Sequence, residues 1–141
     1  MVFSSWTVFL YLLFGNTSSF KERKTNRVDT FKCKYHFRKY KVAQGHPFLV
    51  VIIKETKDEN GKTLLSGFNL THSVTYVLSR PNKFIRISNP NPSDDADCFL
   101  NTDMVKDKPI GKFSKPIPNW ELSEDDIKEI DAILLEKYNI K

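Results

Sequence analysis

Residues 48–70 constrain the fold most, because two strand patterns flank the strongest hairpin signal in the chain. Residues 48–53 form a continuous apolar run rich in β-branched side chains, which is typical of a central strand covered on both faces. Residues 58–61 end in Asn-Gly, the dipeptide that hairpin turns favour most. Residues 63–70 then have the composition of a return strand. The sequence therefore predicts an antiparallel hairpin with at least one buried strand.

Shorter strand patterns surround this hairpin. Residues 31–42 alternate with the period of two that is typical of a half-buried strand with a cationic outer face. One face is expected to carry Phe31, Cys33, Tyr35 and Phe37, and the other Lys32, Lys34, His36 and Arg38. Further strands are expected at residues 73–78, 83–87, 98–100 and 111–113, with a polar turn joining the last two. The proline-rich and polar stretch 89–95 is expected to be irregular.

The last segment of the chain carries the only convincing helical pattern. Ser123 is a good N-cap, and Asp126 three residues later completes a box-like pair. Acidic residues fill the first turn, where the helix dipole favours them. One apolar stripe follows at helical spacing, made of Ile127, Ile130, Ile133, Leu134 and Tyr138. Short strands followed by one helix predict a mainly β fold, a small barrel or curled sheet with the helix packed on it.

Length and charge limit the other possibilities. A chain of 141 residues with 40% hydrophobic residues is expected to form one domain with a real core. The formal charge is +5, and it is unevenly spread. Residues 21–41 contain nine Lys and Arg, whereas residues 121–137 contain seven acids. This asymmetry favours an anionic partner such as nucleic acid, and the alternative is that both stretches are simply solvated faces.

The two cysteines, Cys33 and Cys98, are too few for a disulfide framework. Both have strand-like neighbours, which favours buried free thiols in a reducing compartment. Cys33 and His36 have C-x2-H spacing, but no second ligand pair accompanies them. The sequence therefore predicts neither a metal site nor another cofactor.

The first thirty residues do not match the remainder. Residues 6–14 are an apolar run of nine, too short to span a bilayer, and no positive charge precedes it. A divergent signal sequence, an extra element packed on the barrel and a misplaced start remain open, and the last two are favoured. Residues 21–30 have the composition of a linker. We therefore expect an N-terminal extension, residues 1–30, and a barrel domain, residues 31–141, that is cytoplasmic and not membrane-bound.

Three motifs occur in order along the predicted domain. They are Gly-His-Pro-Phe-Leu-Val-Val-Ile at 45–52, Gly-Phe-Asn-Leu-Thr-His-Ser at 67–73, and Ile-Gly-Lys-Phe-Ser at 110–114 followed by the Leu-Ser helix start at 122–131. In order and spacing they resemble the MazF/PemK/Kid toxin family. In that family, Arg-Pro opens the first strand, Thr-Ser ends the second, and a Gly-Lys-Leu strand precedes a Leu-Ser-capped helix.

The resemblance implies an SH3-like barrel, usually a homodimer, that acts as the toxin of a type II toxin–antitoxin system. Such a protein cleaves single-stranded RNA without a metal and is held inactive by a cognate antitoxin. The ribose 2′-hydroxyl attacks the adjacent phosphorus, which requires a base, an acid and donors to the phosphorane oxygens. The resemblance places His46 at the position of the family's arginine and Thr71 at that of its threonine.

His46 is the main departure from the family pattern. Arginine is a fixed cation, whereas histidine titrates near neutral pH. His46 is therefore a candidate acid or base, and His72, beside Thr71, is its candidate complement. The phosphate contacts are then expected from Arg80, Lys83 and Arg86, together with Lys34 and Arg38 of the basic strand. The plain alternative is that both histidines are solvent-facing and that Thr71 only favours a strand.

Two classes of function remain open. One is a metal-independent endoribonuclease toxin. The other is the same barrel without catalysis, binding nucleic acid or a protein through its basic strand. Asn89, Asn91 and Asn101 are candidates to contact RNA bases or to cap turns, and Trp120 and Tyr76 are candidates to stack bases or to pack in the core.

Overall fold

The computed structural model describes residues 31–140 and contains one antiparallel five-stranded sheet. The strands are β1 (Phe31–Tyr40), β2 (Phe48–Lys57), β3 (Thr63–Thr71), β4 (Phe84–Ile87) and β5 (Cys98–Pro109), in the order β1-β2-β3-β5-β4. Three helical segments accompany them: α1 (Val74–Leu78), the 3-10 turn η2 (Ile110–Lys112) and α2 (Glu124–Tyr138). The expectations for residues 1–30 lie outside the described residues.

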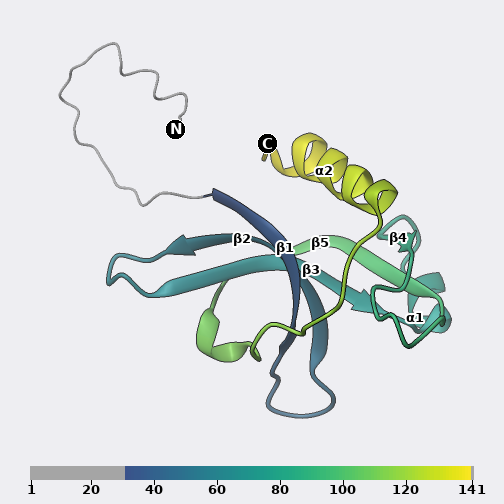
Figure 1. Ribbon diagram of the computed structural model, residues 1–141, viewed down its shortest axis with the longest axis horizontal. Helices are drawn as coiled ribbons and strands as arrows, with labels where there is room; N and C mark the ends of the chain where they lie inside the picture. The colour runs from purple at the N-terminus through teal and green to yellow at the C-terminus, as the bar shows by residue number, and fades with distance from the viewer. Residues whose placement is uncertain (1–30, 141) are drawn as a thin grey trace.

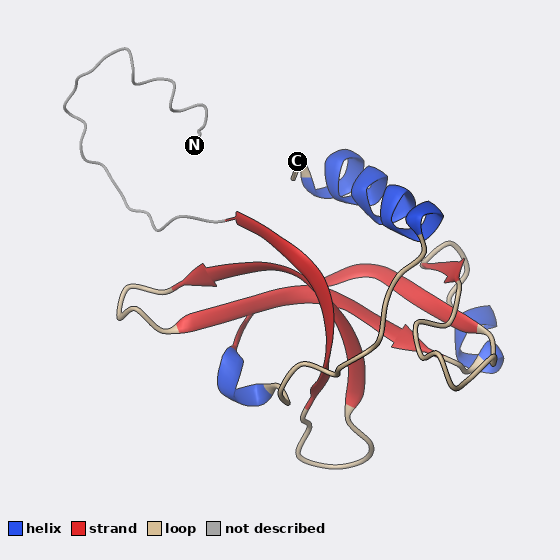
Figure 2. Cartoon of the chain, in the orientation of Figure 1, coloured by secondary structure: helices blue, strands red, loops and turns tan. Residues whose placement is uncertain are grey.

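The sheet curls into a half-barrel, and α2 lies across one side of it (Figures 1 and 2). The mainly β fold with a C-terminal helix is thus confirmed. Sheet curvature has a local cause here, because the register shifts in three of the four strand pairs, and such bulges bend a strand and increase its twist. None of the helices among the described residues is long and apolar enough to cross a membrane.

The core divides between the two faces of the sheet. The face under α2 carries the larger cluster, which consists of Phe37, Val51, Ile53, Phe68, Leu70, Ile87, Cys98, Leu100, Ile130 and Leu134. The opposite face carries Val50, Ile52, Leu65 and Phe113. Adjacent residues of β2 therefore point into different clusters, and this explains why residues 48–53 are apolar without interruption.

The predicted hairpin is confirmed as β2 and β3. Lys57 pairs with Thr63, and Asp58 N–H donates to the Lys62 carbonyl at 2.9 Å. Asp58 Oδ1 accepts from the backbone N–H groups of Asn60 and Lys62. Gly61 has φ +79°, a left-handed conformation that closes a three-residue hairpin loop.

The predicted strand at residues 73–78 is wrong, because this segment forms the short helix α1. Ser73 caps the helix, its Oγ accepting from Tyr76 N–H at 3.1 Å. The N-cap preference of serine outweighs the β propensity of the valines that follow. No residue of α1 is buried, and Leu78 is 74% exposed.

Of the predicted pair of closing strands, the one at 98–100 is confirmed as the start of a longer strand, whereas the polar turn after it and the strand at 111–113 are wrong. Residues 98–109 form the single long strand β5, which pairs with both β3 and β4. Its polar residues resemble a turn in sequence, but they lie on partly exposed positions of a strand whose register shifts twice. Phe113 makes only an isolated bridge with Tyr40.

The predicted alternation of β1 holds for only part of the strand. Tyr35 and Phe37 pack with the cluster under α2, as expected for residues two apart. Cys33 packs against the opposite cluster, because the register shifts between Lys32 and His36. This bulge changes the face on which the side chains before it lie.

The C-terminal helix is confirmed. Ser123 Oγ accepts from Asp126 N–H at 3.1 Å, as an N-cap does. The Asp126 carboxylate does not complete the predicted box; its Oδ2 instead accepts from Ser88 N–H at 2.9 Å. This partly buried contact joins the start of α2 to the residue after β4. Asn139, with φ 56°, ends the helix.

Candidate functional site

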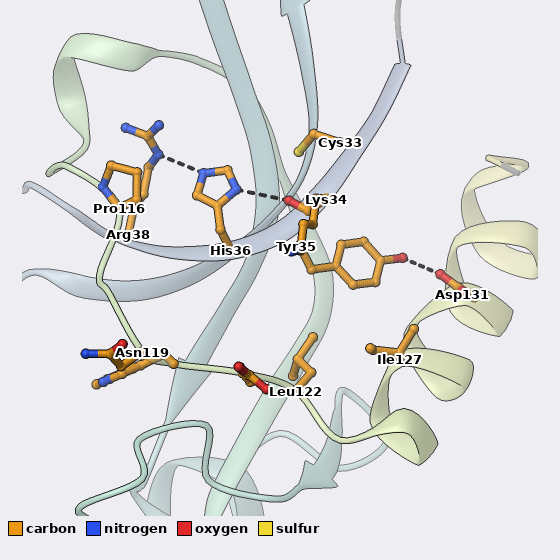
Figure 3. A pocket seen from close by; sticks show the side chains of 12 residues that line it. Cys33, Lys34, Tyr35, His36, Arg38, Pro116, Asn119, Leu122, Ile127 and Asp131 are labelled. Atoms are coloured by element: carbon orange, nitrogen blue, oxygen red, sulfur yellow. Dashed lines mark hydrogen bonds between the residues drawn. The ribbon is translucent and has the colours of Figure 1, made fainter.

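A groove of about 910 Å³ runs along β1, the edge strand of the sheet (Figure 3). Its opposite wall comes from α2 and from the segment that leads into it. The lining residues are Cys33, Lys34, Tyr35, His36, Arg38, Pro116, Asn119, Trp120, Glu121, Leu122, Ile127 and Asp131. In the C-terminal half of β1, Ile117 N–H donates to the Phe37 carbonyl and Ser114 N–H to the Lys39 carbonyl, both at 2.8 Å. These two bonds fix the segment beside the strand.

His36 lies at the centre of the β1 wall and is held by two bonds (Figure 3). Arg38 Nε–H donates to His36 Nε2 at 2.9 Å. Because the guanidinium only donates, Nε2 must be unprotonated. His36 Nδ1, 3.1 Å from the Lys34 carbonyl, then carries the proton and donates to that oxygen. The ring is therefore a neutral imidazole of defined tautomer.

The pKa of His36 is lowered from its ordinary value. Burial is the largest cause, and the nearby Arg38 charge acts in the same direction, whereas the bond to the Lys34 carbonyl opposes them. Protonation would also break the bond from Arg38, since Nε2 would then become a donor. The neutral form is thus favoured by both solvation and geometry.

Acidification is expected to destabilise the fold partly through His36. In the unfolded chain a histidine pKa lies near 6.5, above that of folded His36, so the unfolded state binds the proton first as the pH falls. The stabilisation that neutral His36 contributes is full above the pKa of the unfolded chain. It is lost as the pH falls from that pKa towards the lower pKa of folded His36. The urea midpoint should therefore fall less in His36→Gln than in the wild type between about pH 7.5 and about pH 5. Equal acid sensitivity of the two proteins would contradict this account.

Tyr35 connects β1 to α2 across the groove. Its hydroxyl donates to Asp131 Oδ1, from the middle of the helix (Figure 3). Burial raises the pKa of Tyr35 far above its usual range, and the hydrogen bond to the Asp131 carboxylate raises it further. The phenol therefore stays protonated and acts as a structural donor. This contact places the groove's two walls relative to each other.

Both cysteines are free thiols, as the sequence suggested. Burial raises the pKa of Cys33, and it raises the pKa of Cys98 to about 11. Neither thiol is thus activated as a nucleophile. Within residues 31–140, no three His, Cys, Asp or Glu side chains are grouped so that they could hold a metal ion. Both ring nitrogens of His36, the candidate partner of Cys33, already have protein partners.

A second cluster brings together three of the residues proposed from the sequence. His72 Nδ1 donates to the Asp97 carbonyl at 2.7 Å, and Arg86 Nη2 forms an ion pair with Asp97 Oδ1 at 2.5 Å. Thr71 and Arg86 both pair with Phe99, so that they lie in one row across β3, β5 and β4. A small pocket of about 370 Å³ beside Arg86 and Asp97 adjoins this cluster. We call Thr71, His72, Arg86 and Asp97 the Asp97 cluster.

The other four cations proposed as RNA contacts either have protein partners or lie away from the Asp97 cluster. Lys83 forms an ion pair with Asp103 at 3.2 Å, and the Arg80 guanidinium lies 4.3 Å from the centre of the Tyr76 ring. Lys34 and Arg38 belong to the groove along β1 instead of to the Asp97 cluster. The five proposed RNA contacts therefore fall into two groups, at β1 and around α1 and β4, the two edges of the sheet.

His46 lies in the exposed loop before β2, and its imidazole makes no hydrogen bond or ion pair with the described residues. The pairing of Leu49 with Leu70 brings the start of β2 beside the end of β3. His46 is three residues before that pair, and Thr71 is one residue after it. The strand register thus places them at the same end of the β2–β3 pair.

The three asparagines proposed as base contacts each accept a local backbone hydrogen bond. The side-chain oxygens of Asn89, Asn91 and Asn101 each accept from the backbone N–H two residues later. For Asn89 and Asn91, in the loop between β4 and β5, this geometry agrees with the turn-capping alternative, whereas Asn101 lies within β5. Trp120 packs edge-to-face on Phe37 while it lines the groove, and Tyr76 is 41% exposed on α1.

No family model, curated protein or solved structure matches this chain. The functional argument therefore depends on the residues themselves. Sequence reasoning missed Asp97, which organises the Asp97 cluster, and Asp131, which fixes Tyr35. Asp97 lies in an acidic run, and Asp131 directly follows Ile130 within a helix that contains several other acids, so neither had a distinguishing local signal.

Proposed function

We propose that the protein is a metal-independent endoribonuclease of the MazF/PemK type that cleaves single-stranded RNA by 2′-hydroxyl attack. The observation that carries the proposal is the shared binding of His72 and Arg86 to Asp97, with Thr71 in the same row of the sheet as Arg86. An oriented imidazole, a guanidinium and a hydroxyl are the groups that this reaction requires. The motifs at residues 45–52, 67–73 and 110–114 support the same family of activities.

The tautomer of His72 suits a general base. Because a carbonyl oxygen only accepts, Nδ1 carries the proton and Nε2 of the neutral ring is left to accept one. His72 is exposed, so that Nε2 is accessible to a ribose hydroxyl. In this proposal His72 removes the 2′-hydroxyl proton, Arg86 and Thr71 donate to the phosphorane oxygens, and His46 protonates the leaving oxygen.

Binding of RNA requires Arg86 to exchange one anion for another. The Arg86 side chain is 70% exposed and that of Asp97 is 48% exposed. Exposed ion pairs of this kind contribute little stability, at most about 1 kcal/mol. A phosphodiester can therefore replace the Asp97 carboxylate on Arg86 while the Asp97 carbonyl continues to hold His72.

The alternative function, a barrel that binds nucleic acid or a protein without cleavage, also has an observation in its favour. Asp97 and Asp103 neutralise Arg86 and Lys83, and the exposed acids Asp94 and Asp95 lie close by in sequence. A site with this balance of charge binds a phosphate backbone less strongly than five unpaired cations would, so within this alternative it favours a protein partner over nucleic acid. The homodimer and the cognate antitoxin belong to the ribonuclease proposal and not to this one.

The deciding experiment incubates the full chain with a long unstructured RNA in EDTA. The proposal expects fragments that end in 2′,3′-cyclic phosphate, and no cleavage where one 2′-deoxynucleotide replaces the nucleotide that attacks. RNA that is bound but never cut would contradict it and favour the binding module. Cleavage that EDTA abolishes would contradict the metal-independent mechanism.

A further inference from the structure

The groove along β1 combines the aromatic rings of Tyr35 and Trp120 with charges of both signs. Trp120 is fixed by its edge-to-face contact with Phe37, whose ring centroid lies 5.7 Å away. Lys34 and Arg38 lie on the β1 wall, and Glu121 lies on the opposite segment. A rigid ring beside cations is the arrangement that binds unpaired nucleotides, because bases stack on aromatic faces and phosphates need positive charge.

The two cations keep donors available for a phosphate. Lys34 is exposed, and its ammonium group makes no ion pair with the described residues. Arg38 uses Nε for His36 and Nη1 for the Ser114 carbonyl at 3.0 Å, and these bonds hold its guanidinium in place. Nη2 has no partner among the described residues. Among its described residues, the β1 wall therefore offers a guanidinium that is held in place and an ammonium group, neither of them in an ion pair.

The acids of the groove differ in availability. Asp131 accepts from the Tyr35 hydroxyl and helps to place the wall. Glu121 is exposed, and its backbone is fixed by donation from its N–H to the Pro90 carbonyl at 3.3 Å. Glu121 directly follows Trp120 in the sequence and lines the same groove. A carboxylate accepts from the exocyclic amino group of cytosine, whereas uracil has a carbonyl oxygen at that position.

We propose that the groove along β1 binds one unpaired nucleotide of an RNA strand and prefers bases that carry an exocyclic amino group. The phosphate contacts Lys34 and Arg38, the base stacks on Trp120, and Glu121 accepts from the amino group. This inference depends on the proposed function only in taking RNA as the ligand. The subsite is separate from the Asp97 cluster, although one segment borders both: Glu121 lines the groove and Asp126 lines the small pocket beside Asp97.

Tryptophan fluorescence tests the subsite directly. The chain contains two tryptophans, so that Trp6→Phe leaves Trp120 as the reporter in the full chain. The ligands are 2′-O-methyl oligonucleotides of eight cytidines or eight uridines, which lack the attacking hydroxyl and cannot be cleaved. We expect the cytidine oligomer to quench Trp120 and to bind about fivefold or more tightly than the uridine oligomer.

Three variants on this background complete the test. Lys34→Gln is expected to weaken binding severalfold and to lower the salt slope by about one. Lys62→Gln, an equal charge change in the exposed β2–β3 hairpin, should leave both unchanged. Glu121→Gln should remove the preference for cytidine, because an amide both donates and accepts.

Absence of quenching, or equal effects of Lys34→Gln and Lys62→Gln, would overturn the subsite. A cytidine preference that survives Glu121→Gln would overturn its assignment to that residue. Because the oligomers cannot be cleaved, these results are independent of catalysis. Tight binding of the cytidine oligomer by a protein that never cuts RNA would support the subsite and refute the ribonuclease. RNA cleavage without quenching of Trp120 would refute the subsite and support the ribonuclease.

Discussion

Replacing Gly67 with alanine is expected to leave a chain that does not fold stably. Gly67 lies in β3, the central strand, paired with Ile52 of β2 and Val105 of β5. A Cβ atom at this position would lie 2.2 Å from the Val51 carbonyl oxygen and 2.8 Å from Val50 Cγ1. The oxygen belongs to the backbone of a buried strand, so that the clash can be relieved only if β2 and β3 move apart.

The cost should exceed the ordinary range for overpacking, which is about 1–3 kcal/mol. We expect a loss of about 4 kcal/mol or more, comparable with the whole stability of a small domain. Far-ultraviolet circular dichroism and urea unfolding measure this effect. Gly111→Ala is the matched control, because nothing lies within 4 Å of its added Cβ, and its stability should change by less than about 0.5 kcal/mol. If Gly67→Ala unfolded in urea at the same concentration as the wild type, the close approach of β2 to β3 would be contradicted.

The elements predicted correctly are those whose signals are local. The Asn-Gly turn with its flanking apolar runs produced β2 and β3, and Ser123 with the apolar stripe produced α2. In both, the residues that specify the element also make its defining contacts. Gly61 adopts the left-handed conformation itself, and Ser123 caps the helix itself.

The errors occurred where distant pairing decides the structure. Residues 101–103 resemble a turn in composition, yet β5 continues through them because β3 and β4 supply partners along its length. Thr102 N–H, for example, donates to the Lys83 carbonyl at 2.7 Å. Lys83 is nineteen residues from Thr102, and a partner at that separation leaves no trace in a local pattern.

The residues of the candidate site also divide into those with a local sequence signal and those that only distant pairing brings together. Thr71 and His72 were proposed together because they are adjacent, and Arg86 because it flanks a strand. Asp97, the common partner of His72 and Arg86, could not be inferred, since the β3–β5 and β4–β5 registers alone bring it to them. The groove along β1 was missed for a similar reason. It depends on the bulge before His36 and on contact between Tyr35 and α2, which are properties of the folded chain.

Removing the imidazole of His72 is expected to have the largest effect on catalysis. If its Nε2 accepts the 2′-hydroxyl proton, His72→Ala should lower kcat/KM for RNA cleavage by about 10²–10⁴-fold, the usual contribution of a general base. Stability should change little, because the side chain is exposed and has one hydrogen bond. The measurement is the rate of release of cyclic-phosphate ends under single-turnover conditions.

A second substitution separates catalysis from support of the loop. His72→Asn has a side-chain N–H to donate to the Asp97 carbonyl but has no basic nitrogen. If the imidazole only braces Asp97, His72→Asn should cleave RNA much as the wild type does and His72→Ala alone should fail. If the imidazole is the base, both variants should fail equally, and added imidazole should partly restore cleavage by His72→Ala. Arg86 depends on the same Asp97, so near-normal RNA affinity in His72→Asn would assign the loss to proton transfer instead of to binding.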